Sequence, residues 1–154
     1  MSYQEKKSVT NIISSIVITT IYGLIMYQRY LNGSMDTSNI IKFWAVVLLI
    51  FIPISIIARI IIMIVFHVIE AIIQTAKGEE PDAEMDVTDE RDKLIQLKST
   101  TISMYIFSIG FILALGTQLF DVSNHVFFIV LLAMGFLADI VSESLMIKYY
   151  RSGV

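Results

Sequence analysis

Residues 127–147, FFIVLLAMGFLADIVSESLMI, form a long apolar run that contains two carboxylates, Asp139 and Glu143. An α-helix rises about 1.5 Å per residue, so about 20 apolar residues cross the hydrocarbon core of a bilayer. The run is long enough to span a membrane as a helix. Asp139 and Glu143 are one helical turn apart, so their side chains share a face of that helix.

A carboxylate inside a span costs about 2.5–3.5 kcal/mol at the bilayer centre on insertion scales, and it is tolerable only where it faces protein, water or an opposite charge. Arg59 lies inside another apolar run, and it is the basic residue placed to pair with the two carboxylates. Measured from residues 42 and 125, where the two runs begin, Arg59, Asp139 and Glu143 all lie 14–18 residues deep. We therefore expect the three groups at a similar depth, where Arg59 can bind a carboxylate through two parallel hydrogen bonds.

Three interpretations of this cluster stay open. Arg59 and a carboxylate can form a structural ion pair that fixes helix packing, or Arg59 and Glu143 can reach the interface along their long side chains without partners. The functional interpretation is an ion, proton or ligand site, because intramembrane acids are functional candidates by default. One arginine and two acids leave a surplus carboxylate, which is then protonated or binds a cation.

The composition also indicates a membrane protein. The chain has 154 residues, of which 56% are hydrophobic and 16% charged, and its mean hydropathy is +0.75. A soluble domain carries about 25% charged residues. The net charge of −3 argues against direct nucleic-acid binding, which needs a basic patch. The lack of cysteine in the sequence excludes disulfides and thiolate metal sites.

The apolar runs predict the fold class: an all-α, polytopic membrane protein, a four-transmembrane-helix bundle with cytoplasmic helical extensions. The whole chain, residues 1–154, is expected to form one membrane domain. The predicted spans are about 9–27, 42–66, 101–120 and 125–147, and an acidic cytoplasmic loop is predicted at about 74–99. One long helix is expected from about Asp89 to Thr117, amphipathic at first and embedded in the membrane later.

Small and polar residues inside the spans predict where helices meet. Such residues usually lie at helix–helix contacts, where they find hydrogen bonds or let two backbones approach closely. The first span is polar for a span, and the third and fourth carry stripes of small residues. These residues are Asn11, Ser14, Ser15, Thr19 and Thr20 in the first span, Ser99, Ser103, Gly110 and Ala114 in the third, and Gly135, Ala138 and Ser142 beside the two acids.

Lysines and arginines are unevenly distributed about the predicted spans. Eight lie on the side of the two termini and the long loop, and two lie on the other side. Because cytoplasmic loops carry the excess of positive residues, we expect both termini and the long loop in the cytoplasm, with the protein in the cell (cytoplasmic or inner) membrane. The eight are Lys6, Lys7, Lys77, Arg91, Lys93, Lys98, Lys148 and Arg151, and the two are Arg29 and Lys42.

Two further polar residues, His67 and Glu70, follow Arg59 along the second run. Glu70 is eleven residues from Arg59, about three turns, so it lies on the same helix face. His67 and Glu70 either form a polar track toward the cytoplasm or lie beyond the bilayer and are merely solvated. Haem binding is not expected, because the other histidine, His125, is predicted near the opposite face of the membrane.

The acidic loop contains a partial match to a calcium-binding loop, Asp82-x-Glu84-x-Asp86. The match fails at the sixth position, where Val87 stands instead of glycine, and at the twelfth, where Lys93 stands instead of an acid. We therefore expect no metal site there. The loop is either a solvated acidic segment or a docking surface for a basic partner.

Enzyme signatures are missing from the sequence. It has no metal-ligand cluster, no glycine-rich phosphate loop and no serine elbow. With two separated histidines, a Ser–His triad has little support. We expect no enzyme activity, no catalytic residue and no cofactor.

The residues before the third span, DERDKLIQLK at 89–98, form a recognisable pattern. This pattern and the four-span layout resemble a group of small, uncharacterised bacterial and archaeal membrane proteins with an Asp-Glu-Arg motif before the third span. The resemblance brings no established activity, but some members resemble partners of helix-turn-helix regulators, which would suit an acidic docking loop. It implies Asp89, Glu90 and Arg91, with the adjoining Asp92, as candidate site residues. Their alternative role is to cap the helix and form local salt bridges.

Two function classes remain. The first is a regulatory or partner-binding membrane protein, in which the cytoplasmic extensions contact another protein and the charges in the spans lock or switch the bundle. The alternative is a small oligomeric cation or proton channel or transporter that uses Arg59, Asp139 and Glu143 as its polar site. The expected partners are the lipid bilayer, a cytoplasmic protein and, through the small-residue faces, a second copy of the chain.

Overall fold

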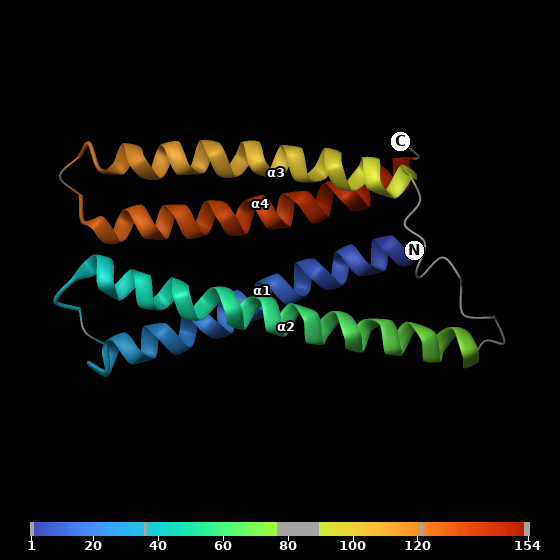
Figure 1. Ribbon diagram of the computed structural model, residues 1–154, viewed down its shortest axis with the longest axis horizontal. Helices are drawn as coiled ribbons and strands as arrows, with labels where there is room; N and C mark the ends of the chain where they lie inside the picture. Colours follow the sequence, from blue (N-terminus) through green and yellow to red (C-terminus); the bar gives the residue numbers. More distant parts are fainter. Residues whose placement is uncertain (1, 36, 77–89, 121, 153–154) are drawn as a thin grey trace.

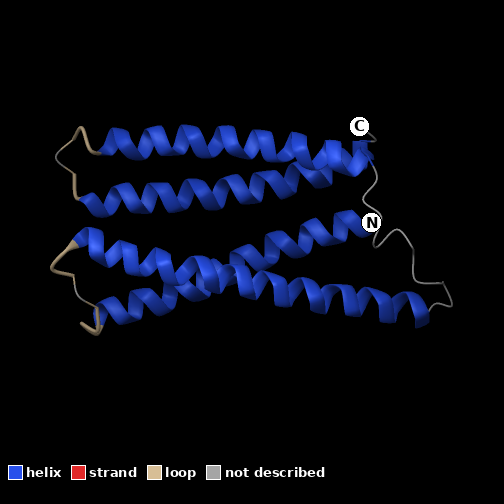
Figure 2. Cartoon of the chain, in the orientation of Figure 1, coloured by secondary structure: helices blue, strands red, loops and turns tan. Residues whose placement is uncertain are grey.

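The computed structural model describes the chain except for residues 1, 36, 77–89, 121 and 153–154. The described residues form four helices and no strand (Figure 2). All four helices are long and apolar enough to cross a membrane. The chain is therefore a multi-pass membrane protein, and the predicted all-α four-helix bundle is confirmed. The helices are α1 (Tyr3–Leu31), α2 (Ile40–Ala76), α3 (Glu90–Thr117) and α4 (Asn124–Ser152).

α1, α2 and α4 extend past the predicted spans at both ends, and α3 begins before its predicted span. α1 starts at Tyr3 because Ser2 caps it: the Ser2 Oγ accepts a hydrogen bond from the Glu5 backbone N–H at 3.3 Å. The chain leaves α1 through Gly33, whose φ of 64° lies in the left-handed region that glycine adopts without strain. α2 has 37 residues, a length of about 55 Å against the ~30 Å of a hydrocarbon core. Part of α2 therefore lies outside the core.

The four helices form two pairs (Figure 1). α3 and α4 lie side by side and pack most closely, whereas α1 packs against both α4 and α2, and α2 contacts α4 at few positions. At Gly110 of α3 the two backbones are so close that an added Cβ would overlap the Met134 side chain of α4. Ser99, Gly110 and Ala114 are buried, so the predicted close-packing stripe of α3 is confirmed there.

The described residues bury few apolar side chains, and a cluster of them lies between α1 and α2. Tyr22, Phe43 and Val47 form its centre, and the Tyr22 hydroxyl donates a hydrogen bond to the Val47 carbonyl oxygen at 2.6 Å. Most large apolar side chains point outward instead. This distribution suits a bundle whose surroundings are lipid, because lipid tails cover apolar side chains as well as a protein core does.

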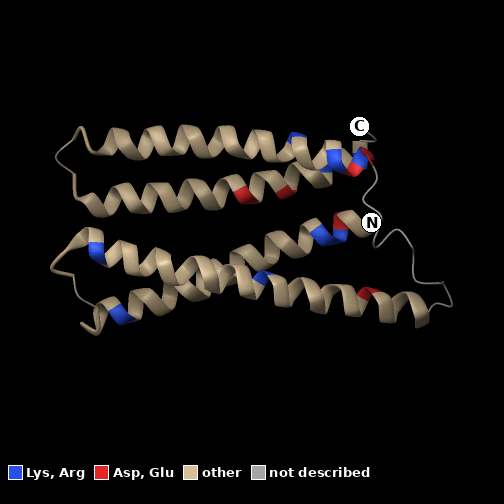
Figure 3. Ribbon diagram, in the orientation of Figure 1, with Lys and Arg blue, Asp and Glu red and all other residues tan. Residues whose placement is uncertain are grey.

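Charged side chains are concentrated at the end of the bundle where the described chain begins and ends (Figure 3). Arg59, Asp139 and Glu143 lie away from this end, inside α2 and α4. The fold therefore keeps three ionisable groups within the apolar segments, and these groups are the starting point for the site.

Candidate functional site

Arg59 of α2 and Asp139 of α4 form an ion pair between two helices. Arg59 Nη2 lies 2.7 Å from Asp139 Oδ2, and Nη1 lies 3.3 Å from Oδ1. The guanidinium group therefore binds the carboxylate through two parallel hydrogen bonds, the geometry that favours arginine over lysine. The side chains of Arg59 and Asp139 are 41% and 33% exposed, so protein does not cover the pair completely.

Ser15 brings α1 into the same cluster. Its hydroxyl accepts a hydrogen bond from Arg59 Nη2 and donates one to Asp139 Oδ2. Ser15 is itself buried. One hydroxyl thus connects the cation to the anion, and three helices meet at a single polar point. The sequence indicated this residue only as one of several polar positions in the first span.

Glu143 does not share Arg59 with Asp139. Its carboxylate accepts a hydrogen bond from Asn11 Nδ2 of α1, with Nδ2 and Oε1 2.8 Å apart. Glu143 is 7% exposed, and its second oxygen, Oε2, has no hydrogen-bond partner among the described residues. Ser8 of α1 is near enough to act on the carboxylate, but it does not reach Oε2 with hydrogen-bond geometry. Glu143 is therefore the surplus acid of the cluster.

A cavity of about 840 Å³ lies beside the ion pair, mainly between α1, α2 and α4. Along α1 its lining runs from Ser15 to Tyr30, along α2 from Phe43 to Arg59, and along α4 from His125 to Asp139. Ser15, Arg59 and Asp139 therefore stand at the same end of the cavity, one on each helix. Between the two ends the lining is mostly apolar. The cavity is thus a long apolar space with a charged, hydrogen-bonding end.

Aromatic residues line the opposite end of this cavity. Trp44 of α2 donates a hydrogen bond from Nε1 to His125 Nδ1 of α4, with the two nitrogens 3.0 Å apart. Trp44 also stacks on Phe128, with ring centroids 5.4 Å apart. α2 and α4 are therefore joined by one polar contact at each end of the cavity.

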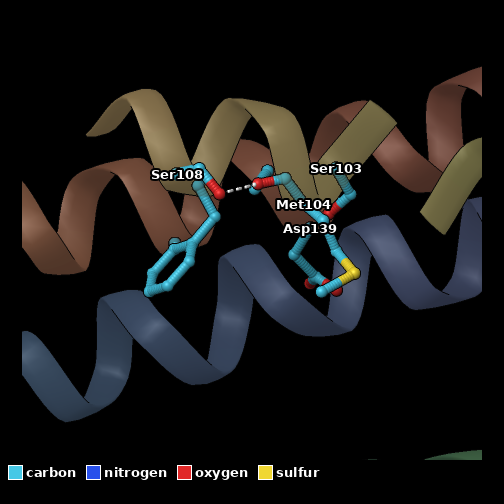
Figure 4. A pocket seen from close by; sticks show the side chains of 7 residues that line it. Ser103, Met104, Ser108 and Asp139 are labelled. Carbon is cyan, nitrogen blue, oxygen red and sulfur yellow. Dashed lines mark hydrogen bonds between the residues drawn. The ribbon is translucent and has the colours of Figure 1, made fainter. Parts of the chain in front are cut away.

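A second, smaller cavity of about 280 Å³ lies between α3 and α4 beside Asp139. Figure 4 shows Asp139 beside Ser103 and Met104 of α3, with Ser108 one turn further along. The Ser108 hydroxyl donates to the Met104 carbonyl oxygen within its own helix. Phe107, Gly135 and Asp139 line both cavities, so the two cavities adjoin one another at Asp139.

The structure separates His67 and Glu70 from the Arg59 cluster. Glu70 is buried and accepts two hydrogen bonds from Lys6 Nζ of α1, at 2.9 and 3.1 Å. His67 donates from Nδ1 to the Met63 carbonyl oxygen of its own helix. Glu70 is thus a paired acid and not a solvated one. No contact recorded for the described residues links His67 to Glu70, so the two do not form a connected track.

The start of α1 ties the charged end of the bundle together. Three consecutive residues of α1 each contact a different helix, and these three pairings could not be predicted from the sequence. The contacts are Gln4 Nε2 to Asp92 Oδ2 of α3 at 3.4 Å, Glu5 Oε1 to Arg151 Nε of α4 at 3.6 Å, and Lys6 to Glu70 of α2.

The Asp-Glu-Arg segment lies only partly in the described chain. Asp89 falls outside the described residues, as does the acidic stretch before it. Glu90 and Arg91 are exposed in the first turn of α3, and Asp92 accepts the hydrogen bond from Gln4. The segment therefore has one residue engaged in the bundle and two on its surface.

Comparisons of the chain with protein-family models, curated proteins and solved structures found no match. The resemblance to the four-span group with an Asp-Glu-Arg motif therefore stays a prediction. The function has to be argued from the cluster of Ser15, Arg59 and Asp139, from Glu143 with Asn11, and from the two cavities.

Proposed function

We propose that this chain is a regulatory membrane protein that binds a single-chain amphiphile with an acidic head group in the large cavity between α1, α2 and α4. The observation that carries the proposal is the position of the Ser15–Arg59–Asp139 cluster at one end of an otherwise mostly apolar space of about 840 Å³. Ligand pockets commonly have volumes of about 300–1,000 Å³, with apolar walls and a few polar groups that fix orientation. The cavity has both properties.

The free donors of Arg59 indicate the chemistry of the head group. A guanidinium group has five N–H donors, and three of the bonds it makes go to Asp139 and Ser15. The remaining donors have no partner in the part of the chain that the structure describes. A carboxylate or phosphate oxygen matches these donors and also competes with Asp139 for Arg59. The apolar chain of the ligand would then lie along the cavity toward Trp44.

The regulatory part of the proposal rests on how weakly α2 is held. Of its described residues, Phe43, Val47 and Glu70 are buried. Its polar contacts to α4 are Arg59–Asp139 and Trp44–His125. The residues of both contacts line the cavity, so a bound molecule acts on the bonds between α2 and α4. A segment with few buried contacts is the kind that moves on binding.

We further propose that a movement of α2 changes the binding of a protein partner on the cytoplasmic side. α2 ends at Ala76, where the acidic segment begins, and α3 starts with Glu90 and the exposed Arg91. In this proposal residues 77–92 contact a cytoplasmic protein, both termini are cytoplasmic, and the protein lies in the inner membrane of a bacterium. The concentration of lysine and arginine at the end where the termini lie supports this orientation (Figure 3).

Trp44 allows a direct test, because it is the single tryptophan of the chain and lines the cavity. A brominated fatty acid is titrated into protein in phosphatidylcholine nanodiscs, and the quenching of Trp44 fluorescence is measured. We expect saturable quenching in the wild type. Quenching that rises in proportion to the amount of fatty acid, without saturation, would contradict a site.

A pair of glycines supplies matched variants for this test. A Cβ atom added at Gly23 or at Gly116 meets no atom within 4 Å, and of these two glycines Gly23 lines the cavity. Gly23→Leu is expected to fill the cavity and abolish saturable quenching, whereas Gly116→Leu leaves it unchanged. Equal effects of the two variants would speak against the cavity as the binding site.

The second candidate function is a small oligomeric cation or proton transporter. It is favoured by the row of polar side chains within the spans, from Asn11 and Glu143 to Ser15, Asp139 and Arg59. A proteoliposome flux assay compares the wild type with the Asp139→Asn/Glu143→Gln double variant. Flux that is lost in a folded double variant supports transport. Equal flux in both, or none in the wild type, rejects it.

A further inference from the structure

Two buried oxygen atoms at the contact between α1 and α4 lack hydrogen-bond partners among the described residues: Glu143 Oε2 and Asn11 Oδ1. Their side chains already touch, since Asn11 Nδ2 donates to Glu143 Oε1 at 2.8 Å. Asn11 Oδ1 and the donor Nδ2 belong to one carboxamide group, and Glu143 Oε2 and the acceptor Oε1 belong to one carboxyl group. Both oxygens therefore belong to groups that are already joined by one hydrogen bond.

Buried acceptors without a partner are unfavourable, and a buried carboxylate without a counter-ion is more so. As long as Glu143 is ionised, neither oxygen has a hydrogen to offer the other. A single proton on Oε2 changes this, because a protonated carboxyl group has one O–H donor. Oε2 then donates to Asn11 Oδ1, and both unsatisfied atoms gain a partner at once.

We propose that the folded bundle holds a proton on Glu143, as a carboxylic acid joined to the Asn11 carboxamide by two antiparallel hydrogen bonds, at neutral pH. Glu143 is then a proton-binding site within the membrane span. Asn11 positions it and does not itself titrate.

The charges around Glu143 agree with this assignment. Arg59 of α2 and Asp139 of α4 both act on Glu143, but they are bonded to one another and their charges cancel. α1 presents the neutral Ser8 and Asn11, α4 presents the Tyr150 phenol, and no charged group of the described part of α3 acts on Glu143. Among the described residues, the cation that acts on Glu143 is Arg59, which is paired with Asp139, so we infer that a proton neutralises the carboxylate.

A metal cation fits this place less well than a proton. Among the described residues there is no group of three or more His, Cys, Asp or Glu side chains that would hold a metal ion. A proton needs one donor atom and one acceptor, and Oε2 and Oδ1 supply both. The inference does not depend on the ligand proposal, because Glu143 and Asn11 line neither cavity.

Infrared spectroscopy of protein labelled with ¹³C at the glutamate carboxyl groups tests the proposal in nanodiscs at neutral pH. The C=O stretching band of a carboxylic acid is separate from the bands of carboxylates, so a protonated glutamate is seen directly. We expect this band in the wild type and its complete loss in Glu143→Gln. The glutamine amide can make the same two bonds to Asn11, so this variant is expected to fold.

Glu70→Gln is the matched control. Glu70 is as buried as Glu143, at 7% exposure, but it is paired with Lys6, so its replacement is expected to leave the acid band unchanged. Asn11→Leu is expected to keep the band and shift it to higher frequency, because the carbonyl loses its hydrogen bond.

Three results would overturn the proposal. The first is the lack of an acid band in the folded wild type, and the second is a band that persists in Glu143→Gln. The third is a band that disappears when sodium chloride replaces an organic-cation chloride. That result would assign the site to a metal ion.

Discussion

Arg59 and Asp139 are 80 positions apart in the sequence and are joined by two hydrogen bonds, of 2.7 and 3.3 Å. Glu143, one turn from Asp139 on the same helix, is bonded to Asn11 instead. The structure therefore assigns the arginine to one acid and leaves the other with a neutral partner. This division gives the two carboxylates different roles, and substitutions can separate them.

Neutralising Asp139 is expected to destabilise the bundle more than neutralising Glu143. Asp139→Asn leaves Arg59 without its carboxylate, and because the pair is partly exposed we expect a loss of about 1–3 kcal/mol, between the values for surface and buried pairs. Glu143→Gln breaks no ion pair. Unfolding of both variants in detergent, followed by circular dichroism, measures the difference. A larger loss in Glu143→Gln would refute the assignment of Arg59 to Asp139.

Ser15→Ala is expected to cost about 1 kcal/mol of unfolding free energy, since it removes a hydroxyl that bonds two charged partners. Its effect should be smaller in the Asp139→Asn background, because the same network is already broken. Ser55→Ala is the control: Ser55 is bonded only within its own helix, to the Ile52 carbonyl oxygen. Additive effects of Ser15→Ala and Asp139→Asn would show that Ser15 does not couple to the pair.

Gly110→Ala is expected to destabilise the α3–α4 pair by about 1–3 kcal/mol, because the new Cβ overlaps the Met134 side chain. Gly116 is also helical but has open space around it. Gly116→Ala is therefore expected to be neutral or to stabilise by up to about 1 kcal/mol through helix propensity. Thermal unfolding of the two variants distinguishes them, and equal melting temperatures would contradict the close approach at Gly110.

The proposed orientation is testable with single cysteines, since the chain has none of its own. Ser34 lies between α1 and α2, and Ser152 ends α4; both are exposed. A membrane-impermeant maleimide added to intact cells is expected to label Ser34→Cys but not Ser152→Cys until the membrane is permeabilised. The reverse pattern would place the termini outside.

The helices and the depth of the charged residues were predictable from the sequence. Long apolar runs require helices in lipid, because each backbone polar group must be bonded within its own segment. The position of Arg59 in its run and of Asp139 in its run placed both at a similar depth. Depth along a helix follows from counting residues, so the proximity of these two side chains was a reasonable expectation.

The partners contributed by α1 were not predictable. Counting residues along the chain does not show how neighbouring helices are rotated about their own axes. This rotation determines that Ser15 and Asn11 face α4. It also determines that Lys6 contacts Glu70. The spacing of Asn11 and Ser15, one helical turn, matches that of Asp139 and Glu143. That shared spacing agrees with the contact but does not identify it, because Ser15 and Thr19 are also one turn apart.

The central claim is that the Ser15–Arg59–Asp139 cluster is the head-group end of a ligand cavity. The most direct measurement compares Trp44 quenching by a brominated fatty acid and by a brominated alcohol of the same chain length, in the wild type and in the charge-neutral double variant Arg59→Gln/Asp139→Asn. Since a hydrogen bond to a charged group contributes about 1.5–3 kcal/mol, the wild type should prefer the acid by about tenfold or more. We expect this preference to disappear in the double variant while the alcohol still binds. An equal preference for the acid in both proteins would contradict it.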